Sequence, residues 1–344
     1  MRDLILVVGG AGYVGSILVR ELLNKGYAVR IFDKFYFGDR GIKDIKDRVE
    51  IIQGDMRNID LSIFEDIDAV VNVGGLSNDP TAEYNPKANY QMNVVATENL
   101  AKLSQKKNIR RFIFASSCSI YDLGLGDEDI VQDEEAKVNP KAAYSKSKYE
   151  AERILLGMAG DNFCPVILRK GTIFGFSYRM RYDLVVNTFI KDALTKGKIS
   201  IFRGGEMWRP LIDIRDVVRA YICCLESPED RVKGQIFNVS RNNYRISELA
   251  YRVREALRDI GIKVEIEADY IPVNVRSYRV STKKTESLLG FHTNYNVEDS
   301  VKNMVKMINK YNYTDFLNPR YYNIQWMTLL EEVEKILKRT GSIF

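Results

Sequence analysis

Two side chains near the middle of the sequence have the types and the spacing of a proton-transfer pair. Tyr144 and Lys148 are four residues apart, so in a helix they lie on one face, a turn from each other. A phenol is a poor base at its ordinary pKa of about 10, but a neighbouring ammonium favours the phenolate. The pair is a candidate base for the hydroxyl of a sugar or an alcohol. The same spacing is also found on amphipathic helix surfaces without any function.

Other common proton carriers and metal ligands are scarce in this chain. His292 is the only histidine, and it lies late in the sequence where a helix is expected to end. A histidine–aspartate base and a histidine-rich zinc site are therefore not expected. The cysteines show no metal-ligand or redox spacing, so we predict no metal site, and thiols of this kind are typical of the cytoplasm. They are Cys118, Cys164, Cys223 and Cys224.

A glycine-rich turn near the N-terminus predicts a dinucleotide site. An apolar strand over residues 4–8 leads into Gly9, Gly12 and Gly15, and a helical pattern follows over residues 16–25. Glycines let the backbone N–H groups approach a pyrophosphate at the positive end of that helix. A second apolar run ends in Asp33, whose carboxylate can accept both hydroxyls of an adenosine ribose and would repel a 2′-phosphate. The unit predicts NAD rather than NADP, and a bound nicotinamide cation would further favour a phenolate at Tyr144.

The glycines fit two overlapping registers, because Gly10, Gly12 and Gly15 also satisfy the G-x-G-x-x-G pattern. The spacing alone therefore does not select one family of nucleotide-binding proteins. The apolar stretch could also be interpreted as a signal peptide, but Asp3 and the glycines within it argue against export.

The intervening sequence alternates between strand and helix patterns, which predicts a doubly wound parallel α/β sheet of the Rossmann type with a smaller C-terminal substrate-binding lobe. A third strand ends before Asp55, which can reach an adenine edge or simply complete a turn, and a fourth ends at Gly74-Gly75. Residues 111–115 form a further strand that leads to Ser116 and Ser117. We predict an NAD-binding domain over residues 1–173 with returns at 211–240, the lobe over 174–210 and 241–314, and a helical extension over 315–344 that packs against the lobe.

Composition narrows the classes of partner. The chain has 344 residues, and 51 basic against 46 acidic side chains give a net charge of +5 without a basic cluster. This balance fits a small anionic ligand better than a nucleic acid. No uncharged apolar run is long enough to span a bilayer, so we expect neither a nucleic-acid nor a membrane partner.

With these motifs in this order, the chain resembles the extended short-chain dehydrogenase/reductase family, in its branch of nucleotide-sugar epimerases and dehydratases. Further motifs of the resemblance are Asn93-Val94-x-x-Thr97, Leu168-Arg169 and Arg209 with Asp216. The resemblance implies that Ser117, Tyr144 and Lys148 are catalytic, and that Arg209 and Arg276 meet the phosphates of a sugar nucleotide. The residues expected to hold NAD, besides Tyr144 and Lys148, are Gly9, Gly12, Tyr13, Val14, Gly15, Asp33, Lys34, Asp55, Met56, Val73, Gly74, Gly75 and Asn93.

Departures from the family pattern narrow the reaction. The 4,6-dehydratases carry an Asp-Glu pair immediately after the catalytic hydroxyl residue, where this chain has Cys118 and Ser119, so dehydration lacks its acid and base. Thr172 stands where many 4-epimerases have asparagine. Other residues expected to contact the substrate are Ser77, Asn78, Ser117, Arg181 and Asn187.

These observations lead us to expect an NAD-dependent nucleotide-sugar epimerase acting at C4 of a UDP-hexose. The alternatives are a keto-sugar reductase with the same catalytic group and, with less support, a dehydratase or a non-catalytic dinucleotide sensor. The resemblance also implies a homodimer formed through the helices near residues 86–107 and 143–159, located in the cytoplasm.

Overall fold

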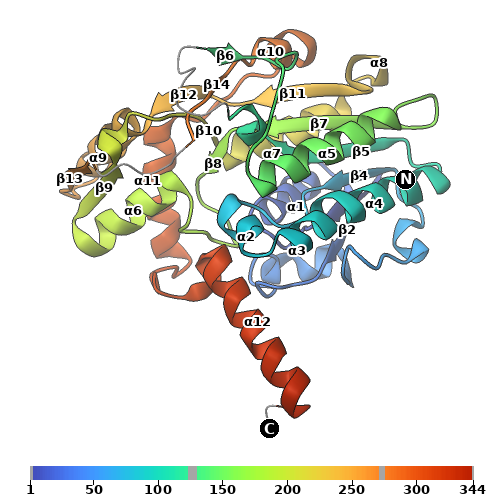
Figure 1. The fold of residues 1–344 in the computed structure, drawn as a ribbon, viewed down its shortest axis with the longest axis horizontal. Helices are drawn as coiled ribbons and strands as arrows, with labels where there is room; N and C mark the ends of the chain where they lie inside the picture. Colours follow the sequence, from blue (N-terminus) through green and yellow to red (C-terminus); the bar gives the residue numbers. More distant parts are fainter. Residues whose placement is uncertain (1–2, 123–129, 271–275, 343–344) are drawn as a thin grey trace.

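A seven-stranded parallel sheet forms the centre of the protein (Figure 1). The computed structural model describes residues 3–122, 130–270 and 276–342. The strand order is β11-β7-β5-β4-β1-β2-β3, so the chain reverses direction across the sheet between β1 and β4, as in a doubly wound fold. The predicted Rossmann-type sheet is confirmed. Its strands are β1 (Leu4–Val8), β2 (Ala28–Asp33), β3 (Glu50–Gln53), β4 (Ala69–Asn72), β5 (Arg111–Ser117), β7 (Cys164–Lys170) and β11 (Gln235–Val239).

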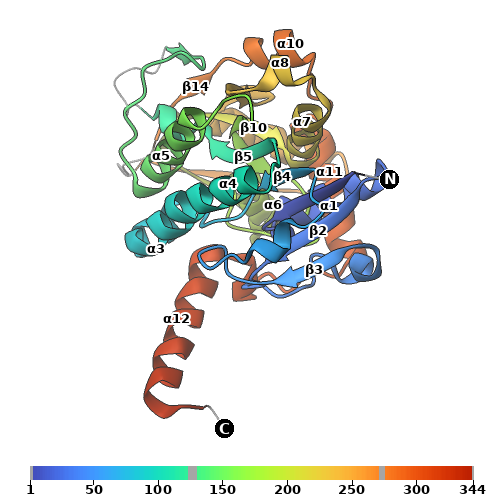
Figure 2. The ribbon, with the colours of Figure 1, turned by 90° about the vertical axis from the view of Figure 1, so that its right-hand side faces the viewer.

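Helices cover both faces of this sheet, which is why β1 is apolar at every position (Figure 2). Ile5 and Val7 face one core, with helices α1 (Gly15–Asn24) and α7 (Ile214–Glu226). The alternate residues Leu6 and Val8 face a second core, below α4 (Ala96–Lys106) and α5 (Ala143–Gly157). The site residues that follow the strands are thus held by a sheet that is buried on both sides.

The expected single helix over residues 86–107 is interrupted. It consists of α3 (Pro86–Tyr90), a π-type turn over Gln91–Val95 and α4. Asn93 lies in this turn, and its side-chain amide donates to the Leu76 carbonyl at 3.0 Å and to the Ser147 hydroxyl at 3.2 Å. The wider turn lets Asn93 reach both neighbours, and turns of this kind occur frequently near functional sites.

A third core lies beside the sheet and contains the later part of the chain. It contains α6 (Val185–Lys196), α9 (Ile246–Arg258) and α11 (Val297–Lys310), with β9 (Lys198–Phe202) paired to β13 (Glu265–Asp269). The remaining short elements are α2 (Asp79–Tyr84), α8 (Glu229–Val232), α10 (Lys283–Leu289), and β6 (Val131–Gln132) paired with β14 (Arg279–Val280).

Residues 208–213 do not return to the large sheet, although the sequence suggested a return over 211–240. β10 (Trp208–Asp213) pairs instead with β8 (Thr172–Phe174) and β12 (Asn242–Arg245) in a separate three-stranded sheet. The reason is Gly171, where the chain leaves β7: a Cβ on Gly171 would lie 2.8 Å from the Pro210 carbonyl oxygen. The close approach of the two backbones carries the chain into the smaller sheet, while α7 and β11 do join the large one.

The last helix, α12 (Asn323–Thr340), lies within the predicted extension over 315–344 and projects away from the rest of the protein (Figures 1 and 2). The residues before it, Phe316, Tyr321 and Tyr322, pack against the third core. Beyond its first residue the helix contacts α2, and Tyr84 of α2 donates a hydrogen bond to Glu331. The expected packing of the extension against the lobe is thus made by its first part, through Phe316, Tyr321, Tyr322 and Asn323.

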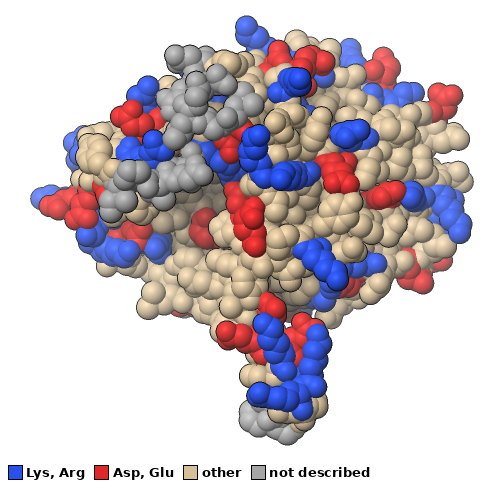
Figure 3. Space-filling view, viewed as in Figure 1, with Lys and Arg blue, Asp and Glu red and all other residues tan. Residues whose placement is uncertain are grey.

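Within the described ranges, no helix has the length and apolar character needed to cross a lipid bilayer. Figure 3 shows basic and acidic side chains interspersed over one face of the molecule and close together on the projecting C-terminal helix.

Candidate active site

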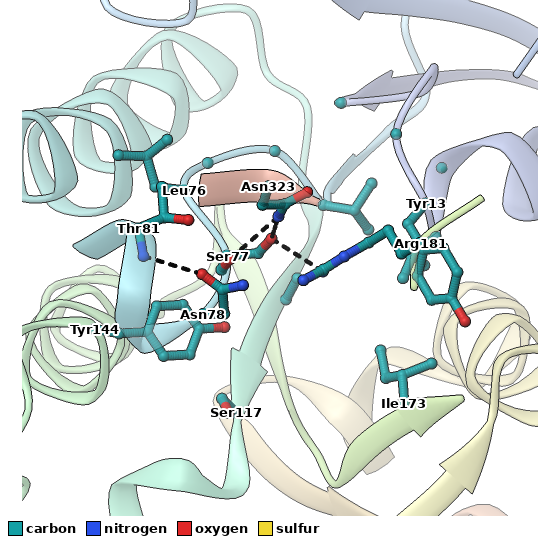
Figure 4. Close-up of a pocket in the computed structure, with 18 of the residues that line it drawn as sticks. Tyr13, Leu76, Ser77, Asn78, Thr81, Ser117, Tyr144, Ile173, Arg181 and Asn323 are labelled. Atoms are coloured by element: carbon teal, nitrogen blue, oxygen red, sulfur yellow. Dashed lines mark hydrogen bonds between the residues drawn. The ribbon is translucent and has the colours of Figure 1, made fainter. Parts of the chain in front are cut away.

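A cavity of about 490 Å³ lies at the carboxyl ends of the parallel strands, where α/β sheets bind ligands. Its walls come from the turns after β1, β2, β4, β5 and β7, from the lobe and from the start of α12 (Figure 4). The predicted cofactor residues on its surface are Gly9, Gly12, Tyr13, Val14, Gly15, Asp33, Lys34, Asp55, Met56, Val73, Gly74, Gly75, Tyr144 and Lys148. The predicted substrate residues there are Ser77, Asn78, Ser117, Thr172, Arg181, Arg209 and Arg276.

The glycine turn has room only for glycine. Gly9 has a φ of +80°, and a Cβ there would lie 2.7 Å from the Cα of Gly74. A Cβ on Gly15 would lie 2.1 Å from the carbonyl oxygen of Gly9. The turn therefore leaves a concave backbone surface at the N-terminus of α1, where a pyrophosphate would be held by N–H groups and by the helix dipole.

Asp33 is fixed at the tip of β2, beside this turn. One carboxylate oxygen accepts from the Ala11 N–H at 3.0 Å and the other from the Phe35 N–H at 2.7 Å. Burial raises the pKa of Asp33, and these backbone hydrogen bonds oppose that effect. The carboxylate keeps further lone pairs for two ribose hydroxyls, so the residues present fit the adenosine end of NAD.

Lys34 and Asp55 form an ion pair at the same end of the cavity, with 2.7 Å between the ammonium nitrogen and a carboxylate oxygen. Hydrogen bonding from Arg57 has the largest effect on Asp55 and holds the pKa of this carboxyl well below its usual range, with a further contribution from Lys34. Asp55 is thus ionised and held in place at the adenosine end of the cavity.

Tyr144 and Lys148 both face the cavity from α5, one turn apart, and Ser117 faces it from the end of β5. Burial raises the pKa of Tyr144 to about 12, which is opposite to the lowering by Lys148 that the spacing suggested. The physical reason is that the Lys148 ammonium lies 5.9 Å from the Tyr144 ring centroid and is itself buried, so that its own pKa is lowered to about 8. The groups that oppose the rise at Tyr144 are the Ser117 hydroxyl, Arg276 and Arg181.

Two cationic groups border the part of the cavity nearest to Tyr144. Arg276 forms an ion pair with Asp79 and keeps one buried guanidinium nitrogen that has no hydrogen-bond partner among the described residues. The Arg209 guanidinium lies 5.4 Å from the Tyr278 ring centroid, and burial lowers its pKa. Both arginines therefore have N–H donors left for the oxygens of an anionic ligand.

A third cation, Arg181, extends from the lobe to the turn after β4. Its guanidinium is bidentate to Asp183, at 2.7 and 3.0 Å, and donates to the Ser77 hydroxyl at 3.3 Å. Asn78 adopts a φ of +94°, and its side-chain oxygen accepts from the Thr81 N–H at 3.2 Å as the N-cap of α2. These contacts fix the loop that lies opposite Tyr13 (Figure 4).

The family model for the NAD dependent epimerase/dehydratase family matches residues 5–240. A UDP-glucose 4-epimerase of Cyamopsis tetragonoloba is 33% identical, over 88% of this chain and 94% of the relative. This chain belongs to the NAD dependent epimerase/dehydratase family. It is an enzyme of that family, and NAD is its cofactor.

Other members of the family are similar over most of the chain. A putative UDP-glucose 4-epimerase of Methanocaldococcus jannaschii is 27% identical, over 90% of this chain and the whole relative. The solved UDP-N-acetylglucosamine 4-epimerase of Methanobrevibacter ruminantium has a TM-score of 0.79 at 23% identity, over 90% of this chain and 100% of its own. Decarboxylases also match, including a UDP-N-acetyl-alpha-D-glucosaminuronate decarboxylase of Bacillus cytotoxicus at 23% identity, over 89% of this chain and 98% of the relative.

Two residues that were predicted to contact a ligand lie behind the cavity wall. Asn93 is buried, and its side-chain oxygen would lie 2.2 Å from a Cβ on Gly75, so it supports the backbone at that glycine. Asn187 is also buried, accepts from the Gly175 N–H at 3.0 Å and donates to the Tyr13 hydroxyl at 3.2 Å. Each positions a residue on the cavity surface and does not itself line the cavity.

The two residues that replace the dehydratase acid and base differ in placement. Cys118 is buried away from the cavity, donates to the Arg169 carbonyl at 3.1 Å, and burial raises the pKa of its thiol. Ser119 does line the cavity, and its buried hydroxyl has no hydrogen-bond partner within the described part of the chain. Neither side chain can supply a carboxylate.

Sequence reasoning missed several residues that line the cavity. Arg179 lies two residues before Arg181 and could have been found as its neighbour in the same loop. Asn323, Ile324 and Met327 gave no local signal, because they belong to a segment outside the resemblance. Others are Tyr36, Phe37, Asp79, Lys170, Asp183, Tyr221 and Tyr278.

Proposed function

We propose that this enzyme epimerises C4 of a UDP-hexose, with Tyr144, Ser117 and Lys148 as its catalytic residues. The observation that carries the proposal is the position of these three side chains in one cavity with the glycine turn and Asp33. Relatives named as UDP-glucose 4-epimerases, including that of Lactobacillus helveticus at 28% identity over 72% of this chain and 81% of the relative, support the choice of substrate.

The proposed chemistry assigns one task to each side chain. NAD, when bound, accepts a hydride from the sugar carbon and returns it, and its cationic ring lowers the phenol pKa. Tyr144 takes the proton of the sugar hydroxyl and later returns it, while Ser117 hydrogen-bonds the reacting oxygen. Lys148 holds the nicotinamide ribose and adds positive charge near the phenolate. The keto sugar turns about its diphosphate before its other face is reduced.

The arginines of the cavity have the shape and charge for the diphosphate of the substrate. A guanidinium binds phosphate oxygens through two parallel N–H groups, and Arg276 has a buried nitrogen that no described residue pairs with. Arg209 lies close by, and the charges of Arg181 and Arg276 also favour the ionised form of Tyr144. The arginines would thus both hold the substrate and, by stabilising the Tyr144 phenolate, support deprotonation of its hydroxyl.

We expect the purified protein to interconvert UDP-glucose and UDP-galactose without added NADH. The reason is that each turnover regenerates the oxidised cofactor. Both sugars, each supplied alone, should reach the same product ratio by anion-exchange chromatography while absorbance at 340 nm stays constant. Stoichiometric NADH consumption with a keto sugar would instead identify a reductase.

Two outcomes would remove the proposal entirely. Conversion of a UDP-uronate with release of carbon dioxide would assign the decarboxylase reaction, and loss of the C6 hydroxyl would assign dehydration. The latter is disfavoured by Cys118 and Ser119, which offer no acid or base in place of the Asp-Glu pair.

We also propose that the enzyme is a homodimer and functions in the cytoplasm. The helices expected at the interface are α3, α4 and α5, on one face of the large sheet. The four cysteines are all free thiols, which fits a reducing compartment.

A further inference from the structure

The start of α12 forms part of the cofactor cavity, although it follows most of the cavity by many residues in the sequence. Asn323, Ile324 and Met327 line the cavity beside residues of the turns after β2 and β4. Asn323 is 5% exposed and is the buried start of a helix whose residues are all exposed from Glu332 to Thr340. A helix that only packed on the protein surface would not place its first turn in the cavity wall.

Asn323 connects three parts of the cavity wall. Its side-chain amide donates to the Ser77 hydroxyl at 2.9 Å, in the turn after β4. Its side-chain oxygen accepts from Arg179 at 2.7 Å, and its backbone N–H donates to Asp183 at 3.0 Å, both in the lobe (Figure 4 shows the contact with Ser77). The large sheet and the lobe are therefore joined across the cavity through one asparagine.

A second connection is made one turn later. The Trp326 indole N–H donates to the Tyr36 carbonyl, three residues beyond Asp33 in the turn after β2. Before the helix, the Tyr321 carbonyl accepts from the Tyr182 N–H at 3.0 Å. Residues 321–327 thus bridge the turn after β2, the turn after β4 and the lobe, and we call this segment the cover.

Arg179 lies under the cover with unmet capacity for an anion. It is 6% exposed, and its Nε has no hydrogen-bond partner among the described residues. The guanidinium carbon lies 3.6 Å from the Phe37 ring centroid, and burial lowers the Arg179 pKa to about 9. Within the described ranges, no carboxylate lies at ion-pair distance from Arg179. A buried guanidinium without an ion-pair partner is costly unless an anion joins it.

We infer that the cover and Arg179 retain NAD in the enzyme, by closing the cavity over the cofactor and offering a guanidinium to its pyrophosphate. Release of the cofactor then requires the bonds of Asn323 and Trp326 to break. The inference deepens the proposed function, because an enzyme that regenerates its NAD in every turnover benefits from keeping it bound. A reductase that exchanges its cofactor in each turnover would be slowed by the same arrangement.

The test is the rate at which bound NAD leaves the protein, measured without any sugar nucleotide. Protein loaded with radiolabelled NAD is chased with unlabelled NAD, and the label that stays bound is followed by rapid filtration. We expect Arg179→Met to speed release roughly 10- to 100-fold and Asn323→Ala roughly 10-fold, from the hydrogen bonds lost. Trp326→Phe keeps the ring, removes one donor and should give a smaller increase.

Lys306→Met, at an exposed position of α11, is the matched control and should release NAD at the wild-type rate. Thermal unfolding of each apo variant separates loss of the cover from loss of the fold. Release rates within twofold of wild type for all three variants would overturn the inference, and so would a wild-type protein that releases NAD within a second. Because no sugar is present, these results are independent of the epimerase proposal.

The outer part of α12 has an exposed apolar side. From Glu332 to Thr340 every residue is exposed, and the helix projects into solvent (Figures 1 and 2). The apolar side chains Leu329, Val333, Ile336 and Leu337 lie on one side and are 40%, 38%, 43% and 38% exposed. An unsupported helical end of this length is marginal in water, so this apolar side needs a covering surface.

The charges on this part of the helix change sign along its length. Acidic residues come first, and basic residues follow: Glu331, Glu332 and Glu334, then Lys335, Lys338 and Arg339. Two copies packed antiparallel would place the acidic half of each against the basic half of the other. From this complementarity, the geometry points to a second copy of this chain as the occupant, with α12 paired to α12 about a twofold axis.

This pairing predicts that the molar mass in light scattering at 10 μM halves in Val333→Glu/Leu337→Glu. Lys335→Glu/Lys338→Glu should also weaken association, because acidic halves then meet. Adding Glu332→Lys/Glu334→Lys should restore it. An unchanged mass in the first variant, a monomeric wild type, or no rescue by the fourfold variant would each refute the pairing. The ratio of masses is informative whether or not α3, α4 and α5 form an additional interface.

Discussion

Tyr144→Phe is expected to lower kcat for epimerisation by about 10³-fold while leaving NAD bound. The substitution removes one oxygen, which in the proposed mechanism is the only base in contact with the sugar hydroxyl, and general-base catalysis typically contributes 10²- to 10⁴-fold. The rest of the cavity wall is unchanged, so substrate and cofactor should still bind. Initial rates of UDP-galactose conversion, with NAD content determined after acid extraction, measure both quantities.

Tyr149→Phe is the matched control, because Tyr149 lies on the same helix but packs against the buried cluster around Cys118 and not in the cavity. It should retain nearly full activity. If Tyr144→Phe kept more than a tenth of the wild-type kcat, another group would have to be the base and the mechanism would be rejected.

Arg169→Met is expected to reduce the free energy of unfolding by about 3–5 kcal/mol, since it leaves a carboxylate buried without its cation. Arg169 and Glu152 are 3% and 1% exposed at their side chains and approach to 2.7 Å. Arg169 also donates to the Tyr121 hydroxyl at 2.7 Å. The pair joins β7 to α5, the helix that carries Tyr144, so activity should fall together with stability.

Urea unfolding followed by circular dichroism measures the change. Glu152→Leu/Arg169→Met removes both charges and should recover most of the lost stability, because no uncompensated ion remains. Removing the exposed pair between Lys198 and Glu267 should cost less than about 1 kcal/mol and serves as the control. A double variant no more stable than Arg169→Met would show that shape, and not the unpaired charge, dominates at this position.

Local patterns in the sequence were sufficient for those parts of the site that are local in space. The glycine turn and Asp33 belong to a single βαβ unit, and Tyr144 and Lys148 to a single helix turn, so spacing alone placed the members of each group beside one another. The direction of the Tyr144 pKa shift could not be predicted in the same way. It depends on burial by residues from several elements, and these outweigh one neighbouring amine.

Contacts between distant segments were beyond sequence reasoning. Asn323 meets Ser77 across 246 residues and Arg179 across 144, and no periodicity encodes such a meeting. The pairing of β10 with β8 depends on the close approach of Gly171 and Pro210, which is likewise set by tertiary packing.

The three arginines proposed to bind the substrate reach the cavity from three separate places: Arg181 before α6, Arg209 in β10 and Arg276 before β14. None of them belongs to a strand of the seven-stranded sheet that carries the glycine turn. Exchange of these segments therefore leaves the ladder of the large sheet intact. The residues that bind NAD and the arginines that select the sugar nucleotide thus lie on separate elements, so the second group can change while the first stays the same. This makes the lobe the natural target for redesigning substrate choice.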